Sequence, residues 1–220
     1  MKKVLQNISK RALPGIYWKR LLLKRLVDDK GSFLNQHGWY KSFQSGIPLD
    51  EEGRQIPWMN YSMLELFNER LTSEMNLFEY GSGASTIYFS KKVKKVISVE
   101  YNESWFKKVS SEIPVNVELI FQNQDIDGKY CRMIKEFPYQ FDVVVIDGRD
   151  RINCIKQSIE KLSPSGIIIL DDSNRDSYQD IFSDESIREF KSINFTGIKP
   201  CSFKFTTTTV FYRPGNCFNI

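Results

Sequence analysis

The hydrophobic positions along most of the chain form short apolar runs that alternate with segments of helical spacing. The apolar runs predict strands at residues 76–80, 96–101, 117–121, 141–146 and 166–170. The segments between them predict helices at residues 85–93, 103–112, 129–136 and 153–162. Because the fourth and fifth runs (VVVI and IIIL) are almost continuously branched at Cβ, we expect them in a parallel sheet covered on both faces. This alternation is typical of a doubly wound, Rossmann-like α/β fold.

The two ends of the chain depart from this alternation. The segment TTTTVFYR (206–213) follows FKSINF with only a loop between them, which predicts a closing pair of strands and a C-terminal antiparallel strand. The sheet would then have seven strands, most of them parallel. Apolar spacing predicts an amphipathic helix over 58–71, whereas 31–57 is rich in turn-forming and aromatic residues and predicts an ordered loop region. We therefore divide the chain into a basic N-terminal appendage of helix and loop (1–57), with the helical part expected in residues 1–30, and a ligand-binding domain (58–220).

The charge of the chain is concentrated at its N-terminus. The 220 residues carry a net charge of +4, but residues 1–30 hold nine Lys and Arg against two Asp, which is 9 − 2 = +7. The remaining residues therefore sum to 4 − 7 = −3, and a mildly acidic body argues against a nucleic-acid partner. Leucines interleaved with the bases of 1–30 leave two interpretations open: an amphipathic helix on an anionic membrane surface, or a solvated or docked segment.

Other features of the composition predict a cytoplasmic protein. The four cysteines have no CxxC spacing, and with a single histidine in the chain neither a zinc site nor a disulfide framework is expected. No apolar run approaches the roughly 20 residues that span a membrane. The N-terminus also lacks the apolar core and cleavage site of a signal peptide.

The segment LFEYGSGASTIYF contains the most informative motif of the chain. Gly81, Ser82 and Gly83 form a tight turn after the first strand, and the next helix begins near Ser85 and Thr86, which are good capping residue types. Glycines at such a turn allow the backbone amides at a helix N-terminus to approach a ligand closely.

Two acidic residues and one departure from the dinucleotide-binding motif limit the class of ligand that this loop is expected to bind. Glu79 precedes the first glycine by two residues, and Glu100 ends the next strand nineteen residues after Gly81. A carboxylate at that strand end accepts hydrogen bonds from ribose hydroxyls. Thr86 occupies the position where dinucleotide-binding loops usually have Gly or Ala, which disfavours NAD or FAD.

The pattern Glu79-x-Gly81-x-Gly83-x-Ser85 followed by Glu100 resembles the class I S-adenosylmethionine-dependent methyltransferases over residues 58–213. Ser85 replaces the frequent third glycine of that family. The resemblance implies that the loop lines the methionine and ribose portions of the cofactor. The cofactor-binding residues that it implies are Glu79, Gly81, Ser82, Gly83, Ser85, Thr86, Glu100, Tyr101, Asp125 and Asp147, with Asp127 as a substitute for Asp125 at the adenine edge. The phrases HGWYKS, DGRDRINC and FYRPGNCFNI resemble an uncharacterised bacterial branch of the family.

Three further acids follow the fourth and fifth strands. Asp147, Asp171 and Asp172 are expected to converge, because ligands of doubly wound sheets bind beyond the carboxyl ends of the strands. Like charges buried together raise one another's pKa, so the group needs a neutralising partner. One interpretation is a divalent cation such as Mg²⁺. The catechol and caffeoyl-CoA O-methyltransferases are distantly similar here, although Asp172 replaces their Asn and Asp150 their catalytic Lys.

Two other interpretations of these acids need no metal. In one, Arg149, Arg151 or Arg175 neutralises them, and Asp147 is a polar or basic group of the acceptor site. In the other, the acids only cap a helix and form a turn.

His37, the single histidine, lies in the turn-like stretch NQHGWYKS. A neutral imidazole near pH 7 takes a proton from an acceptor hydroxyl, so His37 and Asp147 are the predicted catalytic residues. The alternative for His37 is a plain surface residue.

These features predict a methyltransferase that uses S-adenosylmethionine to methylate an oxygen of a small molecule or glycan. A NAD-type oxidoreductase on a similar fold and a non-catalytic nucleoside-binding module are the alternatives.

Overall fold

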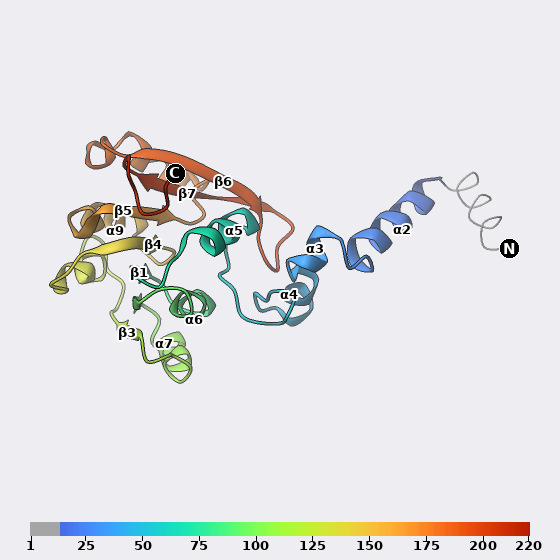
Figure 1. Cartoon of the computed structure of the whole chain (residues 1–220), viewed down its shortest axis with the longest axis horizontal. Helices are drawn as coiled ribbons and strands as arrows, with labels where there is room; N and C mark the ends of the chain where they lie inside the picture. The colour runs from blue at the N-terminus through green and yellow to red at the C-terminus, as the bar shows by residue number, and fades with distance from the viewer. Residues whose placement is uncertain (1–13) are drawn as a thin grey trace.

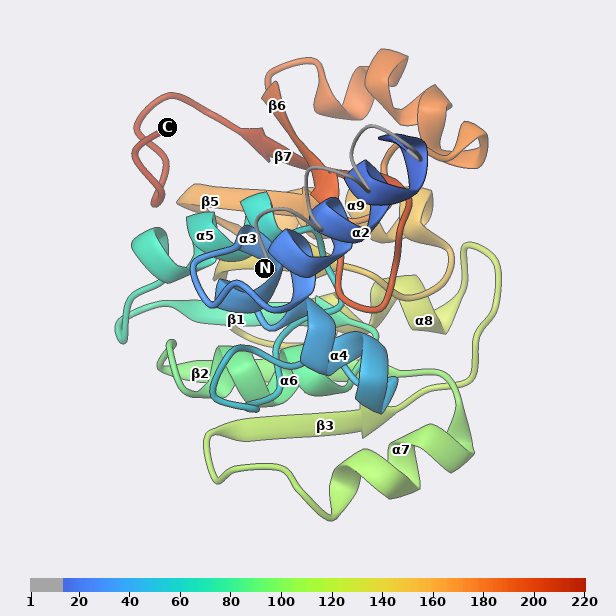
Figure 2. The same ribbon diagram turned by 90° about the vertical axis from the view of Figure 1, so that its right-hand side faces the viewer.

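A computed structural model of the chain describes residues 14–220. It is built around a seven-stranded sheet of order β3-β2-β1-β4-β5-β7-β6, which runs from β3 to β6 up the view of Figure 2. The strands are β1 (Asn76–Tyr80), β2 (Lys95–Glu100), β3 (Val117–Phe121), β4 (Phe141–Ile146), β5 (Leu162–Leu170), β6 (Lys191–Ile198) and β7 (Phe205–Tyr212). Strands β1 to β5 pair in parallel, and β7 pairs antiparallel with both β5 and β6. The predicted fold class is therefore confirmed.

Helices cover both faces of this sheet and create two hydrophobic cores. The helices that follow the appendage are α5 (Tyr61–Arg70), α6 (Ala84–Ser90), α7 (Glu103–Ser110), α8 (Lys129–Arg132) and α9 (Arg151–Ser158), with 3₁₀ turns at Met133–Glu136, Ile159–Lys161, Asp176–Ser183 and Glu185–Ile187. Along β4, Val143 and Val145 belong to one core, whereas Val144 and Ile146 belong to the other. Because successive strand residues point to opposite faces, burial on both sides requires the continuous apolar run seen in the sequence.

Several predicted element bounds need correction. The helix predicted at 153–162 ends at Ser158, because β5 already begins at Leu162. Leu162 pairs with Phe141 across a register irregularity, so a segment rich in Ser, Pro and Gly still belongs to the strand. The helix predicted at 58–71 begins only at Tyr61, because the Oδ1 atom of Asn60 accepts a hydrogen bond from the Met63 amide at 3.0 Å and caps it.

The described part of the appendage combines helices with irregular chain. It contains α2 (Pro14–Val27), α3 (Phe33–Gln36) and α4 (Trp39–Ser45). The loop region predicted over 31–57 contains α3 and α4, because short helices closed by local caps carry little periodicity: the Ser32 hydroxyl caps α3, and Gly46 ends α4 with a φ of 70°.

Helix α4 docks on the connection between β6 and β7. The indole Nε1 atom of Trp39 donates to the Ser202 carbonyl at 2.9 Å, and its ring packs against Phe43 and Phe203. Helix α2 projects away from the sheet (Figure 1). Within residues 14–220, no helix is both long enough and apolar enough to cross a membrane.

Candidate ligand-binding site

The glycine loop between β1 and α6 has a backbone conformation that favours glycine at both Gly81 and Gly83. Gly81 has a φ of 95° and donates from its amide to the Val99 carbonyl at 2.9 Å. A Cβ atom on Gly81 would lie 3.2 Å from the backbone carbon of Asp147, and one on Gly83 would lie 3.4 Å from the indole of Trp105. The loop therefore follows a path that glycine alone adopts without strain.

Glu79 holds the glycine loop and the start of α6 in place through hydrogen bonds. Its side chain is buried and accepts hydrogen bonds from the hydroxyls of Ser85, of Thr86 at 2.6 Å, and of Ser98 at 2.9 Å. Thr86 also accepts from the Gly83 amide at 3.0 Å, so the carboxylate, the helix start and the loop form one network. Burial raises the pKa of Glu79 to about 7, although the three hydroxyls oppose the shift.

Glu100 lies beside the same loop at the end of β2. One carboxylate oxygen, Oε2, accepts from both the amide of Ser82 at 3.0 Å and its hydroxyl at 2.8 Å. The other oxygen, Oε1, accepts from the Asn102 amide at 2.8 Å. The predicted juxtaposition of Glu100 and the glycine loop is present in the structure, and all the donors to this carboxylate are uncharged.

Two cavities open onto the loop. A polar cavity of ≈ 380 Å³ is lined by Glu79, Gly81, Ser82, Ser85, Glu100, Tyr101, Asn102, Ser104, Trp105 and Asp147. A larger cavity of ≈ 590 Å³ lies between the loop and the appendage, where Ile47, Pro48 and Trp58 form part of its wall. Trp105 lines both cavities and donates from Nε1 to the Ser82 carbonyl at 2.8 Å. The loop thus faces a compartment large enough for a nucleoside and an acceptor.

Asp125 does not join this group. Its carboxylate accepts the backbone amides of Lys129 at 2.7 Å and Tyr130 at 3.0 Å, which caps the start of α8. The substitute Asp127 pairs with Arg132 at 2.7 Å. Both acids organise the loop before α8 and neither lines the two cavities, so the adenine-edge role stays a prediction that these contacts do not support.

Arg151 holds the ends of β4 and β5 together. Its guanidinium is buried and donates from Nη2 to Oδ1 of Asp147 at 2.8 Å, from Nη1 to the Asp171 carbonyl at 2.6 Å, and from Nε to the Gly148 carbonyl at 3.0 Å. Because the planar fork reaches three chain positions, it fixes the carboxylate at the edge of the glycine loop.

Asp171 and Asp172 have different partners. Asp171 accepts a hydrogen bond from the Thr208 hydroxyl at 2.7 Å, and burial, together with the charges of Asp147 and Asp172, raises its pKa to about 7. Asp172 binds Lys199 at 2.8 Å, the Thr206 hydroxyl at 2.6 Å and the guanidinium of Arg175. Burial raises the pKa of Asp172, but these partners outweigh it and lower the value to about 2.

These contacts do not support the divalent cation. Across residues 14–220, no group of three or more His, Cys, Asp and Glu side chains is arranged to hold a metal ion. Asp147 and Asp172 are held by Arg151, Arg175 and Lys199 instead. The arginine-paired interpretation therefore describes this site, with Lys199 as a partner that the sequence did not reveal.

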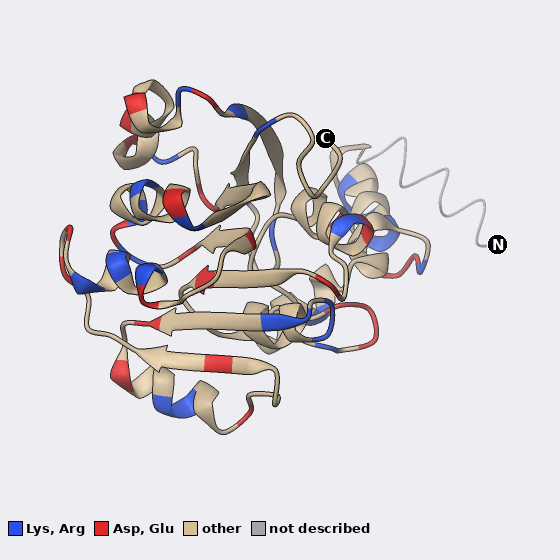
Figure 3. Ribbon diagram, turned by 60° about the vertical axis from the view of Figure 1, so that its left-hand side comes forward, with Lys and Arg blue, Asp and Glu red and all other residues tan. Residues whose placement is uncertain are grey.

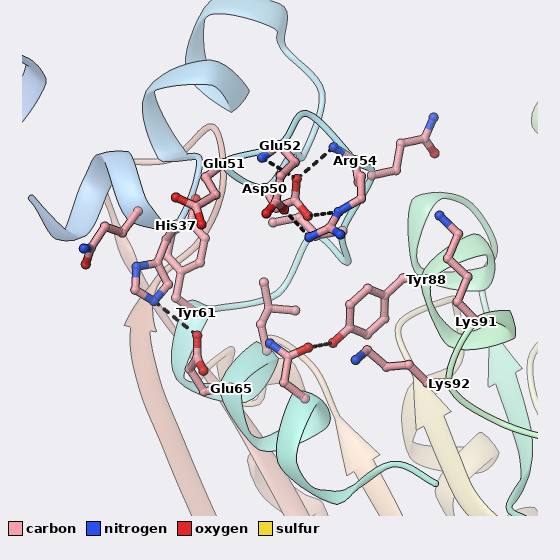
Figure 4. A pocket seen from close by; sticks show the side chains of 15 residues that line it. His37, Asp50, Glu51, Glu52, Arg54, Tyr61, Glu65, Tyr88, Lys91 and Lys92 are labelled. Atoms are coloured by element: carbon pink, nitrogen blue, oxygen red, sulfur yellow. Dashed lines mark hydrogen bonds and ion pairs between the residues drawn. The ribbon is translucent and has the colours of Figure 1, made fainter. Parts of the chain in front are cut away.

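His37 lies in a separate cavity (Figure 4). Its Nε2 atom is 3.2 Å from Oε1 of Glu65, and its ring stacks on Phe33 at a centroid distance of 4.0 Å. This cavity of ≈ 390 Å³ is lined by charged residues from α5, from residues 50–54 and from the two lysines that follow α6, and its lining includes neither the glycine loop nor Asp147. The turn between α3 and α4 directs the ring toward α5, and the catalytic role of His37 stays a prediction that these contacts do not support.

Comparison with known proteins supports the fold. No family model and no curated protein matches this chain. Among solved structures, it is similar to an rRNA methylase from Streptococcus thermophilus (15% identity, 68% of this chain and 92% of that one, TM-score 0.54). It is also similar to a precorrin-6y C5,15-methyltransferase from Geobacter metallireducens (14% identity, 69% and 87%, TM-score 0.53). An S-adenosylmethionine-dependent O-methyltransferase from Thermotoga maritima gives a TM-score of 0.52 at 16% identity, with 72% and 66% covered. At these identities the likeness shows a shared fold.

Sequence reasoning missed three features of the site. Trp105 lies over the loop, but an aromatic residue on a predicted helix gives no sign of that role. Ser98 interrupts the apolar run of β2, and a polar residue in a buried strand is a signal for a buried partner, here Glu79. The Thr tract of β7 supplies hydroxyls to Asp171 and Asp172, which alternation along a strand with one polar face would have indicated.

Proposed function

We propose that this chain binds S-adenosylmethionine and transfers its methyl group to an oxygen of a small molecule or glycan. When bound, this cofactor supplies an electrophilic methyl group on a sulfonium. The acceptor oxygen would form a bond to the methyl carbon as the carbon–sulfur bond breaks, and the electron pair of the broken bond would pass to sulfur. The protein's part is to hold both partners in line and to receive the acceptor's proton.

The environment of Glu100 carries this proposal. A carboxylate offers about four acceptor positions, and Ser82 and Asn102 occupy three of them. One position on Oε1 remains for a ribose hydroxyl, and rotation of the Ser82 hydroxyl frees a second position on Oε2. Because the present donors are neutral, they exchange for ligand hydroxyls without leaving a buried cation unpaired.

Asp147 is the group best placed for the acceptor. Its side chain is 31% exposed and lines both cavities beside Gly81. Arg151 fixes the carboxylate, so it accepts a hydrogen bond, and then the proton, of an acceptor hydroxyl in a constant position. Ile47 of the appendage and Trp58, the first residue of the domain, line the larger cavity, where they would exclude water from the transfer.

Calorimetric titration with S-adenosylhomocysteine tests the proposal. We expect wild-type binding, and at least tenfold weaker binding by Glu100→Ala, since a hydrogen bond to a charged group contributes about 1.5–3 kcal/mol. Glu118→Ala is the matched control, because Glu118 lies on β3, is 47% exposed and pairs with Lys95 at the surface. Glu100→Gln replaces the Ala variant if that variant does not fold.

Three outcomes would count against this function. Absence of wild-type binding rejects the cofactor, and enhancement of NADH fluorescence in its place supports the oxidoreductase alternative. Binding without methyl transfer to any hydroxyl acceptor in a broad panel favours the nucleoside-binding module.

A further inference from the structure

Helix α2 presents large apolar side chains to solvent. None of its residues is buried, and Ile16, Leu22 and Leu23 are 55%, 58% and 61% exposed. Figure 1 shows that the helix extends away from the sheet, with only α3 and α4 between them. A contiguous exposed apolar surface of this kind marks an interaction site rather than a chance surface residue.

The exposed apolar residues share one half of the helix. At about 3.6 residues per turn, the large side chains Ile16, Trp18, Leu22, Leu23 and Leu26 fall within one half of the circumference. That half contains a single base, Lys19, whereas Arg20, Lys24 and Arg25 lie on the opposite half. The helix contains no acid, and Figure 3 shows its basic residues at the end of the molecule remote from the sheet.

We propose that α2 lies on an anionic lipid surface, with its apolar half between headgroups and acyl chains. The charge of the segment fits this partner: α2 holds four bases, and the sequence of residues 1–13 adds four more and no acid. Each base near an anionic bilayer contributes about 1 kcal/mol. Fourteen residues rise only about 21 Å as a helix, so the helix lies along the surface and does not cross it.

The charge pattern favours a membrane over other partners. A second copy of the chain would bring two basic helices together, and like charges oppose that contact. An RNA would engage the bases but leave the leucines in water. A lipid bilayer with anionic headgroups above an apolar interior can contact both the basic half and the apolar half of α2.

Local hydrogen bonds fix the orientation of α2 relative to α3. The Asn35 side-chain amide donates to the carbonyls of Val27 at 2.6 Å and Asp29 at 2.9 Å, and the Ser32 hydroxyl donates to the Leu26 carbonyl at 2.8 Å. Since α4 docks on the β6–β7 connection through Trp39, a bound α2 would hold the body at a defined position above the lipid.

Co-sedimentation of the full chain with vesicles tests this inference. We expect binding to phosphatidylcholine vesicles that contain phosphatidylglycerol, little binding to phosphatidylcholine alone, and weaker binding at high salt. The double variant Leu22→Glu/Leu23→Glu should lose at least tenfold in the partition constant, and so should Arg20→Glu/Lys24→Glu.

The body of the molecule offers a matched control. Val115 and Ile126 are 107% and 89% exposed, so Val115→Glu/Ile126→Glu makes the same chemical change away from α2 and should leave vesicle binding unchanged. Thermal unfolding of each variant verifies that the body remains folded. Equal binding to neutral vesicles, or binding that survives Leu22→Glu/Leu23→Glu, would overturn the proposal. So would a dimer in sedimentation velocity that the same variant dissociates, or RNA retention without vesicle binding.

Discussion

At the ends of β1 and β2, Glu79 and Glu100 accept hydrogen bonds from hydroxyls and backbone amides, whereas at the ends of β4 and β5 two of three aspartates are held by cations. These regions lie on the same edge of one sheet and are joined where Gly81 contacts Asp147. Both must keep carboxylates that are largely removed from water, yet their partners differ in charge and in strength.

This difference in hydrogen-bond partners distinguishes a region that can exchange its donors for a ligand from a region whose geometry is fixed. A neutral donor such as the Ser82 hydroxyl can rotate without leaving a charge unpaired, so the β1–β2 side keeps a carboxylate that the proposed ligand could use. A buried cation cannot leave its acid without a large penalty, so Arg151 and Lys199 keep the β4–β5 side in one geometry. The first region is suited to exchange its donors for a ligand, and the second to hold Asp147 in place.

Removal of Arg151 is expected to cause the largest loss of folding stability, because Arg151 fixes the β4–β5 side. Arg151→Met leaves Asp147 and the carbonyls of Gly148 and Asp171 without their donor, and loss of one partner of a buried pair costs about 3–5 kcal/mol. Urea unfolding should show this loss as a lower midpoint at an unchanged slope. Arg188→Met is the control: Arg188 is 73% exposed and pairs with Glu185, so a change of more than about 0.5 kcal/mol is not expected there. Equal stability of Arg151→Met and wild type would show that the cations are dispensable.

In the β1–β2 region, the titration of Glu79 is expected to have a smaller effect on the free energy of unfolding. Its folded pKa of about 7 lies above the ordinary value of 4.5, so the native state binds this proton more tightly than the unfolded chain. The free energy of unfolding therefore falls as pH rises from about 4.5 to about 7, by about 3 kcal/mol for this one group, and the contribution is constant above that range.

Glu79→Gln removes that titration, so its unfolding free energy should depend less on pH over the same range. Asp171 contributes in the same direction in both proteins, because its pKa is also raised to about 7, and some slope will remain. Glu118→Gln, a change at the exposed end of a surface pair, should reproduce the wild-type profile. An identical pH profile for Glu79→Gln and wild type would mean that Glu79 is solvated rather than buried.

The sequence predicted strand bounds best where a strand is buried on both faces of the sheet, because such a strand needs a nearly continuous apolar run. Strands β1 and β4 have the predicted bounds, because all but one of the residues in each are buried and such a run has no other stable place in this fold. The appendage was predicted poorly for the opposite reason. Helices α3 and α4 are short and are defined by caps and by tertiary contacts such as Trp39 with Ser202, which no periodicity encodes.

The candidate site was predictable only where its chemistry is local in sequence. Gly81 to Thr86 form their network within one loop, and Glu100 follows from a strand spacing. The partner of Asp172 is Lys199, 27 residues further along, and only the β6–β7 hairpin brings the two together. Metal-bound and cation-paired aspartates therefore look alike in sequence, and His37 offered no local signal of its distance from Asp147.

A crystal structure of the chain with S-adenosylhomocysteine tests the central claim most directly. We predict that ribose hydroxyls contact the Glu100 carboxylate with the Ser82 hydroxyl rotated away, while Asp172 stays bound to Lys199 and Arg175. A ligand bound elsewhere, a Glu100 still held by Ser82, or a metal ion between Asp147 and Asp172 would contradict the account.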